Sequence, residues 1–223
     1  MKVFKFRNDE ERNQCNKYLD LKGVAYHVLL INKIGLDNKG KISYKLVSDV
    51  YKYDKRLRNR LYKFLSAFEE QIRAFIANSY NHGLESLQLG ELILTNLKSG
   101  SNIAYELEDL TFNQLLQIVE NLNSKDLKRI FPNSDKYLLD NLKAIKELRN
   151  AISHHRILFL YDEYETCYIN GKPYNDLSNN IINLKNLINE YYKQFLVDSI
   201  NDSVNDKRDN NYYIPQELII KIN

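Results

Sequence analysis

The sequence predicts an all-α protein. Its 223 residues contain only 7 Gly and 3 Pro, which is too few for turn-dense all-β folds. Apolar side chains recur every three or four residues over most of the chain, as in amphipathic helices. Because the segments between these stripes are short, we expect a helical bundle in which consecutive helices lie antiparallel.

The N-terminal part of the chain, about 1–40, predicts two helices. Asn8 is a suitable N-cap for the first, and Glu11 completes the pattern of a capping box. This helix ends near Gly23, and a second run over 24–34 places Val28 and Ile31 at helical spacing. Residues 35–40 are rich in turn formers and predict a loop.

One apolar stripe of about 30 residues predicts the longest helix. Its members are Leu46, Val50, Tyr53, Leu57, Leu61, Phe64, Phe68, Ile72, Phe75 and Ile76. The stripe drifts near Asp54, where a break is an open alternative. Gly83, directly after His82, predicts the end of the helix. Residues 86–100 form a less regular connector with room for a short helix.

The second half of the chain predicts shorter helices. The first covers 112–119, and a short one starts at Asn123 and ends before Pro132. The next is capped by Asn133 or Ser134 and has its core face over 138–148. A final helix covers about 177–195. Residues 161–174 are interpreted as a loop or insertion, 198–211 as a polar linker, and 212–223 as an apolar tail docked on the body or on a partner.

These elements predict one all-α domain over 1–200, with its core over about 43–197, followed by the linker and tail over 201–223. Cys15 and Cys167 lie far apart and in no CxxC pattern, so reduced thiols and a cytoplasmic location are expected. No apolar run approaches the roughly 18 residues of a membrane span. Residues 1–7 lack the apolar stretch of a secretion signal.

Charge and motif content narrow the classes of function. With 32 basic and 29 acidic residues, the formal charge is only +3, so a nucleic-acid site requires local clustering. The chain contains no HExxH, CxxC, phosphate-binding loop or dinucleotide fingerprint, so we expect neither a metal nor a cofactor. His27 and His82 are interpreted as structural or surface side chains.

The remaining candidate is the cluster Arg149-Asn150-Ala-Ile-Ser-His154-His155-Arg156 at the end of an amphipathic helix. Asn150 and His154 share one helical face. Arg149 and His154 lie about 140° apart on an ideal helix. They converge on one ligand if the helix ends or bends near Ser153, or if a second copy of the helix faces this one.

These residue types are suited to binding and cleaving a phosphodiester. An imidazole exchanges protons near neutral pH, and a guanidinium binds phosphate oxygens and stabilises the charge of a transition state. The alternative is a helix C-terminus that favours cations near its last carbonyl groups. Residue types alone slightly favour that alternative.

Three sequence elements together resemble a known family. Arg149-Asn150-xxx-His154 resembles the RNxxxH motif of HEPN ribonucleases, and LRNAISHHRIL resembles the signature of the Abi-like (AbiD/AbiF-type) abortive-infection proteins. VYKYDKRLR over 50–58 and FEEQIR over 68–73 are similar to two further elements of that family. The resemblance covers roughly 47–159. It implies a HEPN-like helical bundle with additional N-terminal helices.

The resemblance also implies an activity, which is metal-independent RNA cleavage that leaves 2′,3′-cyclic phosphate and 5′-hydroxyl ends. The catalytic residues would be Arg149, Asn150 and His154, with Asn150 orienting the imidazole. Supporting or RNA-binding roles fall to His155, Arg156, Glu69, Arg73 and Arg58. Glu69 would hold Arg149 or His154 in place. Because one chain carries one motif, a homodimer would build a composite site.

Position 156 is Arg, where related toxins often carry a modifiable Tyr, so regulation by such a modification is not expected. The expected partners are RNA, a second copy and an antitoxin, and no membrane. The basic side chains between Lys52 and Arg73 offer a second RNA-binding face, although most of them are interpreted as part of a solvated helix surface.

Two alternatives to catalysis remain open at this stage. One is a non-catalytic HEPN module that binds a structured RNA or a protein partner. The other is a structural helical oligomer that uses the motif as a hydrogen-bonded interface. The intact set of Arg149, Asn150 and His154 favours catalysis over both.

Overall fold

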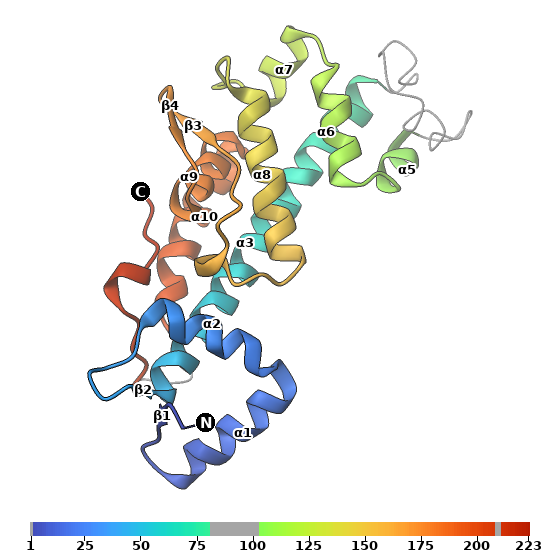
Figure 1. The fold of residues 1–223 in the computed structure, drawn as a ribbon. Helices are drawn as coiled ribbons and strands as arrows, with labels where there is room; N and C mark the ends of the chain where they lie inside the picture. Colours follow the sequence, from blue (N-terminus) through green and yellow to red (C-terminus); the bar gives the residue numbers. More distant parts are fainter. Residues whose placement is uncertain (1, 81–102, 208–210) are drawn as a thin grey trace.

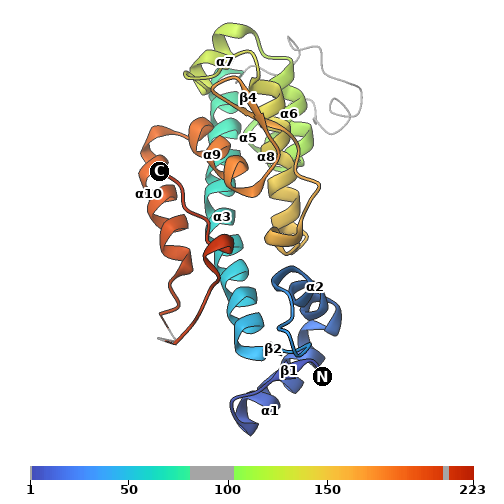
Figure 2. The ribbon, with the colours of Figure 1, turned by 60° about the vertical axis from the view of Figure 1, so that its left-hand side comes forward.

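The all-α prediction is confirmed. A computed structural model describes residues 2–80, 103–207 and 211–223, and these are mostly helical. Helix α3 (Tyr44–Ser79) runs along the length of the molecule, and the other elements pack along it (Figures 1 and 2). Toward its C-terminal end lie α5 (Ile103–Glu108), α6 (Phe112–Glu120), α7 (Ser124–Ile130), α8 (Leu138–Ser153), α9 (Leu177–Leu187) and α10 (Glu190–Asn201).

Helix α3 is continuous over 36 residues. The alternative of a break near Asp54 is therefore excluded, and Arg58, one turn later, pairs with the buried Asp54 carboxylate within the helix. The helix ends at Ser79. The predicted stop at Gly83 and the connector over 86–100 lie outside the described residues.

The N-terminal helices α1 (Asp9–Lys22) and α2 (Val24–Ile34) meet at Gly23, as predicted. Asn8 caps α1 by accepting from the Glu11 amide at 2.8 Å. The Glu11 carboxylate, however, accepts from the amide of Arg7 at 2.7 Å, one residue before the position that a capping box requires.

The buried side of α2 also differs from the prediction. Val28 is 45% exposed, whereas His27, Leu30 and Ile31 are buried. A two-residue parallel pair of β1 (Phe4–Lys5) and β2 (Ile42–Ser43), which was not predicted, brings the N-terminus to the start of α3.

Helices α6 and α7 follow the predicted pattern, and Asn123 caps α7 through the Asp126 amide at 3.0 Å. Helix α8 begins after Tyr137 and not after Asn133 or Ser134. The Asp135 carboxylate accepts from the Tyr137 amide at 2.9 Å, so a local turn occupies the predicted cap position.

The interpretation of 161–174 as a loop missed a hairpin of β3 (Cys167–Ile169) and β4 (Lys172–Tyr174). The strands are joined by Asn170 and Gly171, both with positive φ (53° and 75°), as a type I′ turn requires. The Asn-Gly dipeptide was the available sequence signal.

The predicted final helix is two helices, because Asn189 ends the run and caps α10 through the Tyr191 amide at 3.0 Å. Leu196 and Ile200 form the buried side of α10, whereas Tyr191 and Phe195 are 71% and 54% exposed. Helix α10 also extends to Asn201, into the segment predicted to be a linker.

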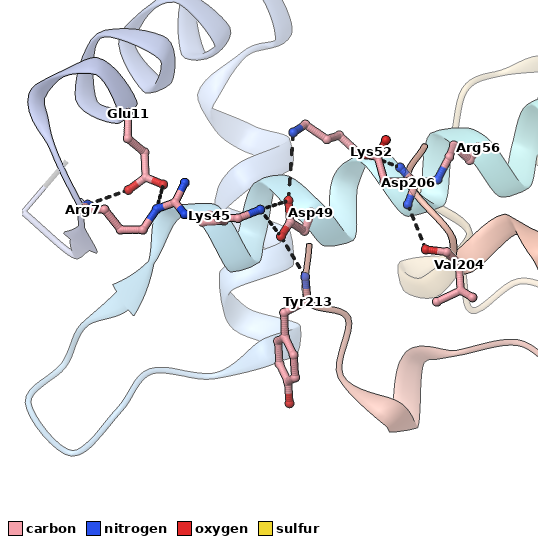
Figure 3. Close-up of polar contacts among 9 residues, drawn as sticks. All are labelled: Arg7, Glu11, Lys45, Asp49, Lys52, Arg56, Val204, Asp206 and Tyr213. Atoms are coloured by element: carbon pink, nitrogen blue, oxygen red, sulfur yellow. Dashed lines mark hydrogen bonds and ion pairs between the residues drawn. The ribbon is translucent and has the colours of Figure 1, made fainter. Parts of the chain in front are cut away.

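The C-terminal tail docks on the body of the molecule. Figure 3 shows the Asp49 carboxylate between Lys45, at 2.8 Å, and the amide of Tyr213, at 3.0 Å. Further along, the Tyr53 hydroxyl accepts from the Ile220 amide at 2.8 Å. Ile214, Leu218 and Ile222 are buried.

Two basic side chains that were predicted to lie on a solvated face of α3 instead bind the segment that follows α10. Arg56 donates to the Ser203 carbonyl at 3.0 Å. It also donates to the Asp206 carboxylate at 2.8 Å (Figure 3). Arg60 donates to the Asp202 carboxylate at 2.7 Å. The polar segment after α10 is therefore fastened to α3.

The apolar interior has two clusters. The larger surrounds the C-terminal two-thirds of α3 and takes in α5 to α10. The smaller joins α2, β2, the start of α3, the tail and Ile157; its members are Leu30, Ile31, Ile42, Val47, Val50, Tyr53, Ile157, Ile214 and Leu218. Since Ile157 follows the candidate motif directly, this cluster packs α2, the start of α3 and the tail around the chain just after the motif.

We predict that Asp49→Ala destabilises the protein by about 3 kcal/mol, because it removes the buried carboxylate that binds both the Lys45 ammonium and the Tyr213 amide. Urea unfolding measures this loss, and limited proteolysis detects release of the tail. Lys55→Ala, at an exposed position of the same helix, is the control and should change neither the free energy of unfolding nor the proteolysis of the tail. An Asp49→Ala variant as stable as wild type would contradict the proposed anchoring.

Candidate functional site

The candidate motif forms the end of α8 and the turn that follows. The His155 amide donates to the Ile152 carbonyl at 3.1 Å, and the Arg156 amide donates to the Ala151 carbonyl at 2.9 Å. These two bonds define a Schellman motif with His154 as the C-cap. His155 occupies the left-handed position with φ of 55°, where Gly is usual.

The turn presents its side chains to solvent. His154, His155 and Arg156 are exposed. Within the described part of the chain, neither imidazole forms a side-chain hydrogen bond or an ion pair. Both rings are therefore open to a ligand, and a non-glycine residue in a strained conformation at such a turn is typical of a functional site.

Arg149, about one turn before the end of α8, forms an ion pair with α3. Its Nε lies 4.0 Å from Glu69 Oε2. The other Glu69 oxygen accepts from Arg73 Nη2 at 2.7 Å, and the same nitrogen donates to the Leu110 carbonyl at 2.7 Å. Of the two partners predicted for Glu69, the structure shows the contact with Arg149.

Asn150 has a different neighbour from the one implied by the resemblance. Its Nδ2 donates to Glu147 Oε1 at 3.4 Å, which is a long and weak hydrogen bond. The Asn150 side chain thus faces back along α8, and the backbone carbonyl of Asn150 accepts from the His154 amide as part of the helix end. Within the described residues, the Asn150 side chain forms no hydrogen bond with the His154 imidazole.

Arg58 does not lie on the surface with the motif. Only 7% of Arg58 is exposed, and its Nε donates to Asp54 Oδ2 at 2.7 Å. Of the two roles expected for Arg58, supporting or RNA-binding, this enclosure with its carboxylate partner is compatible with the supporting one and leaves the guanidinium little access to a ligand.

Asp54 connects this buried pair to the motif. Its second oxygen, Oδ1, accepts from the Leu158 amide at 2.7 Å, two residues after Arg156. Burial raises the pKa of Asp54 to about 6, and the nearby Arg58 opposes that rise. Sequence analysis did not assign Asp54 a role, although an Asp and an Arg four residues apart within an apolar stripe are a signal of a buried pair.

The three sequence elements that carry the family resemblance therefore meet in space. Glu69 from the second contacts Arg149, and Asp54 from the first binds the backbone just after the motif. No protein-family model, curated protein or solved structure matches this chain. The resemblance therefore rests on these sequence elements alone.

Two further observations describe the same residues. In the ranges 2–80, 103–207 and 211–223, no helix has the length and apolar character needed to cross a membrane. The same ranges contain no cluster of three or more His, Cys, Asp or Glu side chains suited to a metal ion.

We predict that His155→Gly stabilises the protein by about 1 kcal/mol, because Gly adopts the left-handed conformation without a steric penalty. Thermal and urea unfolding measure the change. His154→Gly is the matched control, since φ of His154 is −86° and Gly there should lower stability. A loss of stability in His155→Gly would show that the imidazole makes a stabilising contact.

We also predict a pH dependence that belongs to Asp54. A carboxyl whose pKa is raised in the folded state contributes stability below its unfolded pKa, near 3.8, and loses that contribution as pH rises through about 6. The free energy of unfolding of wild type minus that of Asp54→Asn should therefore fall by roughly 2 kcal/mol between pH 4 and pH 7.

Urea unfolding at several pH values tests this dependence. Asp140→Asn, at an exposed position of α8, is the control and should follow the wild-type pH dependence. If Asp54→Asn also follows it, Asp54 does not titrate in this range.

Proposed function

We propose that this protein is a metal-independent endoribonuclease of the HEPN type, acting in the cytoplasm as an effector of abortive infection or of a toxin-like system. One observation carries the proposal: three elements separated by up to about one hundred residues, each similar to the Abi-like family, converge on the end of α8. Residues that only capped a helix would need no such support from another helix.

In the proposed mechanism, neutral His154 accepts the proton of a ribose 2′-hydroxyl, and the 2′-oxygen attacks the adjacent phosphorus. The bond from phosphorus to the 5′-oxygen breaks, and that oxygen receives a proton. The products are a 2′,3′-cyclic phosphate and a 5′-hydroxyl. The exposure of His154 at the helix end is compatible with access of an RNA strand.

Arg149 binds the phosphate in this proposal. Glu69 lies beside its Nε, and the two terminal guanidinium nitrogens have no partner within the described chain. They are therefore available to the non-bridging oxygens, where charge increases in the transition state. Glu69, itself bound by Arg73, acts as a positioning residue because it limits the rotamers of Arg149.

Two arrangements would let Arg149 and His154 act on one ligand: a helix that ends or bends near Ser153, or a second copy of the helix facing this one. Helix α8 ends at Ser153. Each motif supplies one His154, whereas the reaction needs both a base and an acid. A homodimer would supply the second His154 and a second Arg149. His155 and Arg156, both exposed on the turn, would contact the RNA backbone. An antitoxin would then act by covering this turn.

We predict that the wild-type protein cleaves RNA in the presence of EDTA and that His154→Ala and Arg149→Ala lower the rate at least 100-fold. Gel analysis of total RNA measures cleavage, and mass spectrometry of the fragments identifies the cyclic phosphate. Lys143→Ala, on the exposed side of α8, is the control and should retain full activity.

Other outcomes would reject the proposal. Equal cleavage by wild type and His154→Ala would assign the activity to other residues or to a contaminant. Complete loss with EDTA would require a metal. Tight, selective RNA binding without cleavage by wild type would favour the non-catalytic module.

A further inference from the structure

A groove with a volume of about 450 Å³ follows the candidate motif along the chain. This volume falls within the roughly 300–1,000 Å³ of small-ligand sites. Four segments line the groove: the end of α2, the chain from the 3-10 helix η1 (Leu158–Leu160) to Tyr164, the start of α9, and the tail from Glu217 to Ile220. Because these segments are far apart in the sequence, only the tertiary fold creates this surface. We call it the η1 groove.

Two aromatic rings in the wall of the η1 groove are fixed by other aromatic side chains. Phe159 stacks with Tyr53 at 5.3 Å between ring centroids, and Tyr161 meets Tyr164 edge to face at 4.8 Å. Tyr164 in turn donates to the Leu158 carbonyl at 3.0 Å. Phe159 and Tyr161 are both only partly buried, so part of each remains accessible to a ligand. Aromatic side chains of this kind are the surfaces on which nucleobases stack.

The polar side chains of the η1 groove favour a base over a phosphate. Glu217 is exposed, and within the described residues its carboxylate forms no hydrogen bond or ion pair. Asp176 also lines the groove, but its two oxygens accept from Asn179 at 3.0 and 2.6 Å. Two carboxylates repel a phosphate group, whereas a nucleobase is uncharged. Glu217 is therefore the carboxylate that is available to the N–H groups of a base.

A carboxylate distinguishes among the four RNA bases. On its Watson–Crick edge, guanine presents two adjacent donors, N1–H and the N2 amino group, which match the two oxygens of one carboxylate. Adenine and cytosine present an amino group beside an acceptor nitrogen, and uracil presents one N–H between two carbonyl oxygens. These acceptors would face a negative charge without a donor. The exposed ammonium of Lys33, in the same lining, is suited to the O6 acceptor of guanine.

The η1 groove is close to the candidate site. Leu158, in its lining, follows His154 by four residues, and four steps between Cα atoms span at most about 15 Å. The Leu158 amide is also the group that Asp54 binds, so the wall of the groove and the end of the motif turn are fixed together. An RNA strand bound at the turn therefore lies within reach of the groove.

We propose that the η1 groove binds a guanine base of an RNA strand and thereby sets the sequence preference of the candidate site. The base stacks on the aromatic wall, and its N1–H and N2 amino group donate to Glu217. The choice of RNA over a free guanine nucleotide rests on the proposed function, because both present the same base. The choice of guanine rests on the lining of the groove.

Binding of 2′-O-methyl oligonucleotides to the full chain tests the proposal, because they lack the 2′-hydroxyl nucleophile and are not cleaved. The set consists of oligouridines with guanosine, adenosine, cytidine or inosine at the central positions. Inosine differs from guanosine only in lacking the N2 amino group. Fluorescence anisotropy of wild type should show at least tenfold tighter binding of the guanosine oligonucleotide than of the other three, which is the discrimination expected of one bidentate contact.

Two variants separate the proposed contacts. Glu217→Gln should remove the preference for guanosine, because an amide replaces one acceptor oxygen with a donor. Tyr161→Ala should weaken binding of all four oligonucleotides about tenfold, because stacking depends little on the identity of the base. Glu165→Gln, at an exposed carboxylate outside the lining, is the control and should bind like wild type. Circular dichroism checks that the variants fold.

Three results would overturn the proposal. One is equal binding of the guanosine and inosine oligonucleotides by wild type. Another is a preference for guanosine that persists in Glu217→Gln. The third is guanosine monophosphate that binds as tightly as the guanosine oligonucleotide, which would assign the groove to a free nucleotide.

The proposed activity and the η1 groove fail separately. If wild type and Glu217→Gln cleave RNA equally and without a preference for guanosine, the ribonuclease stands and the role of the groove is wrong. If wild type binds the guanosine oligonucleotide selectively but cleaves no RNA, the groove stands and the proposed activity is wrong.

Discussion

The hydrogen bond from the Leu158 amide to Asp54 is the constraint on which the rest of the site depends. It joins the first third of α3 to the chain just after the candidate motif, across 104 positions of sequence. The carboxylate is fully buried and is shared with Arg58, so neither partner can leave without exposing the other to an apolar interior. The bond fixes the chain that leaves the turn, while the Schellman bonds of the turn end α8. The smaller apolar cluster then closes beneath it through Ile157.

The charges of α3 are used largely within the molecule. Arg56 and Arg60 bind the segment after α10, Arg58 binds Asp54, and Arg73 binds Glu69 and the Leu110 carbonyl. The long helix therefore does not present the continuous basic face that its sequence offered. What remains exposed near α8 is a small group of cations and imidazoles at the turn. A formal charge of +3 is consistent with a site that relies on a few well-placed groups.

The turn itself combines stability and strain. Its Schellman hydrogen bonds satisfy the last carbonyl groups of α8, which is the role that the alternative interpretation assigned to the whole cluster. Yet His155 holds a conformation for which Gly is the better residue, and Arg149 receives an ion pair from another helix. A cap needs neither feature. Both are understandable if the side chains were retained for binding.

Local pattern in the sequence determined the helical class, the long central helix, the junction at Gly23, the caps at Asn8 and Asn123, and the position of the candidate motif. These features depend on residues within a turn or two of each other, so periodicity and capping chemistry are sufficient to predict them. The same reasoning misplaced the buried sides of α2 and α10, because two neighbouring faces were both apolar and only the rest of the fold chooses between them. Tertiary structure alone decided that Arg58 is enclosed, that Glu69 contacts Arg149, and that Asp54 fixes Leu158. Those contacts join residues far apart in the chain, and their strength comes from burial, which no local pattern specifies.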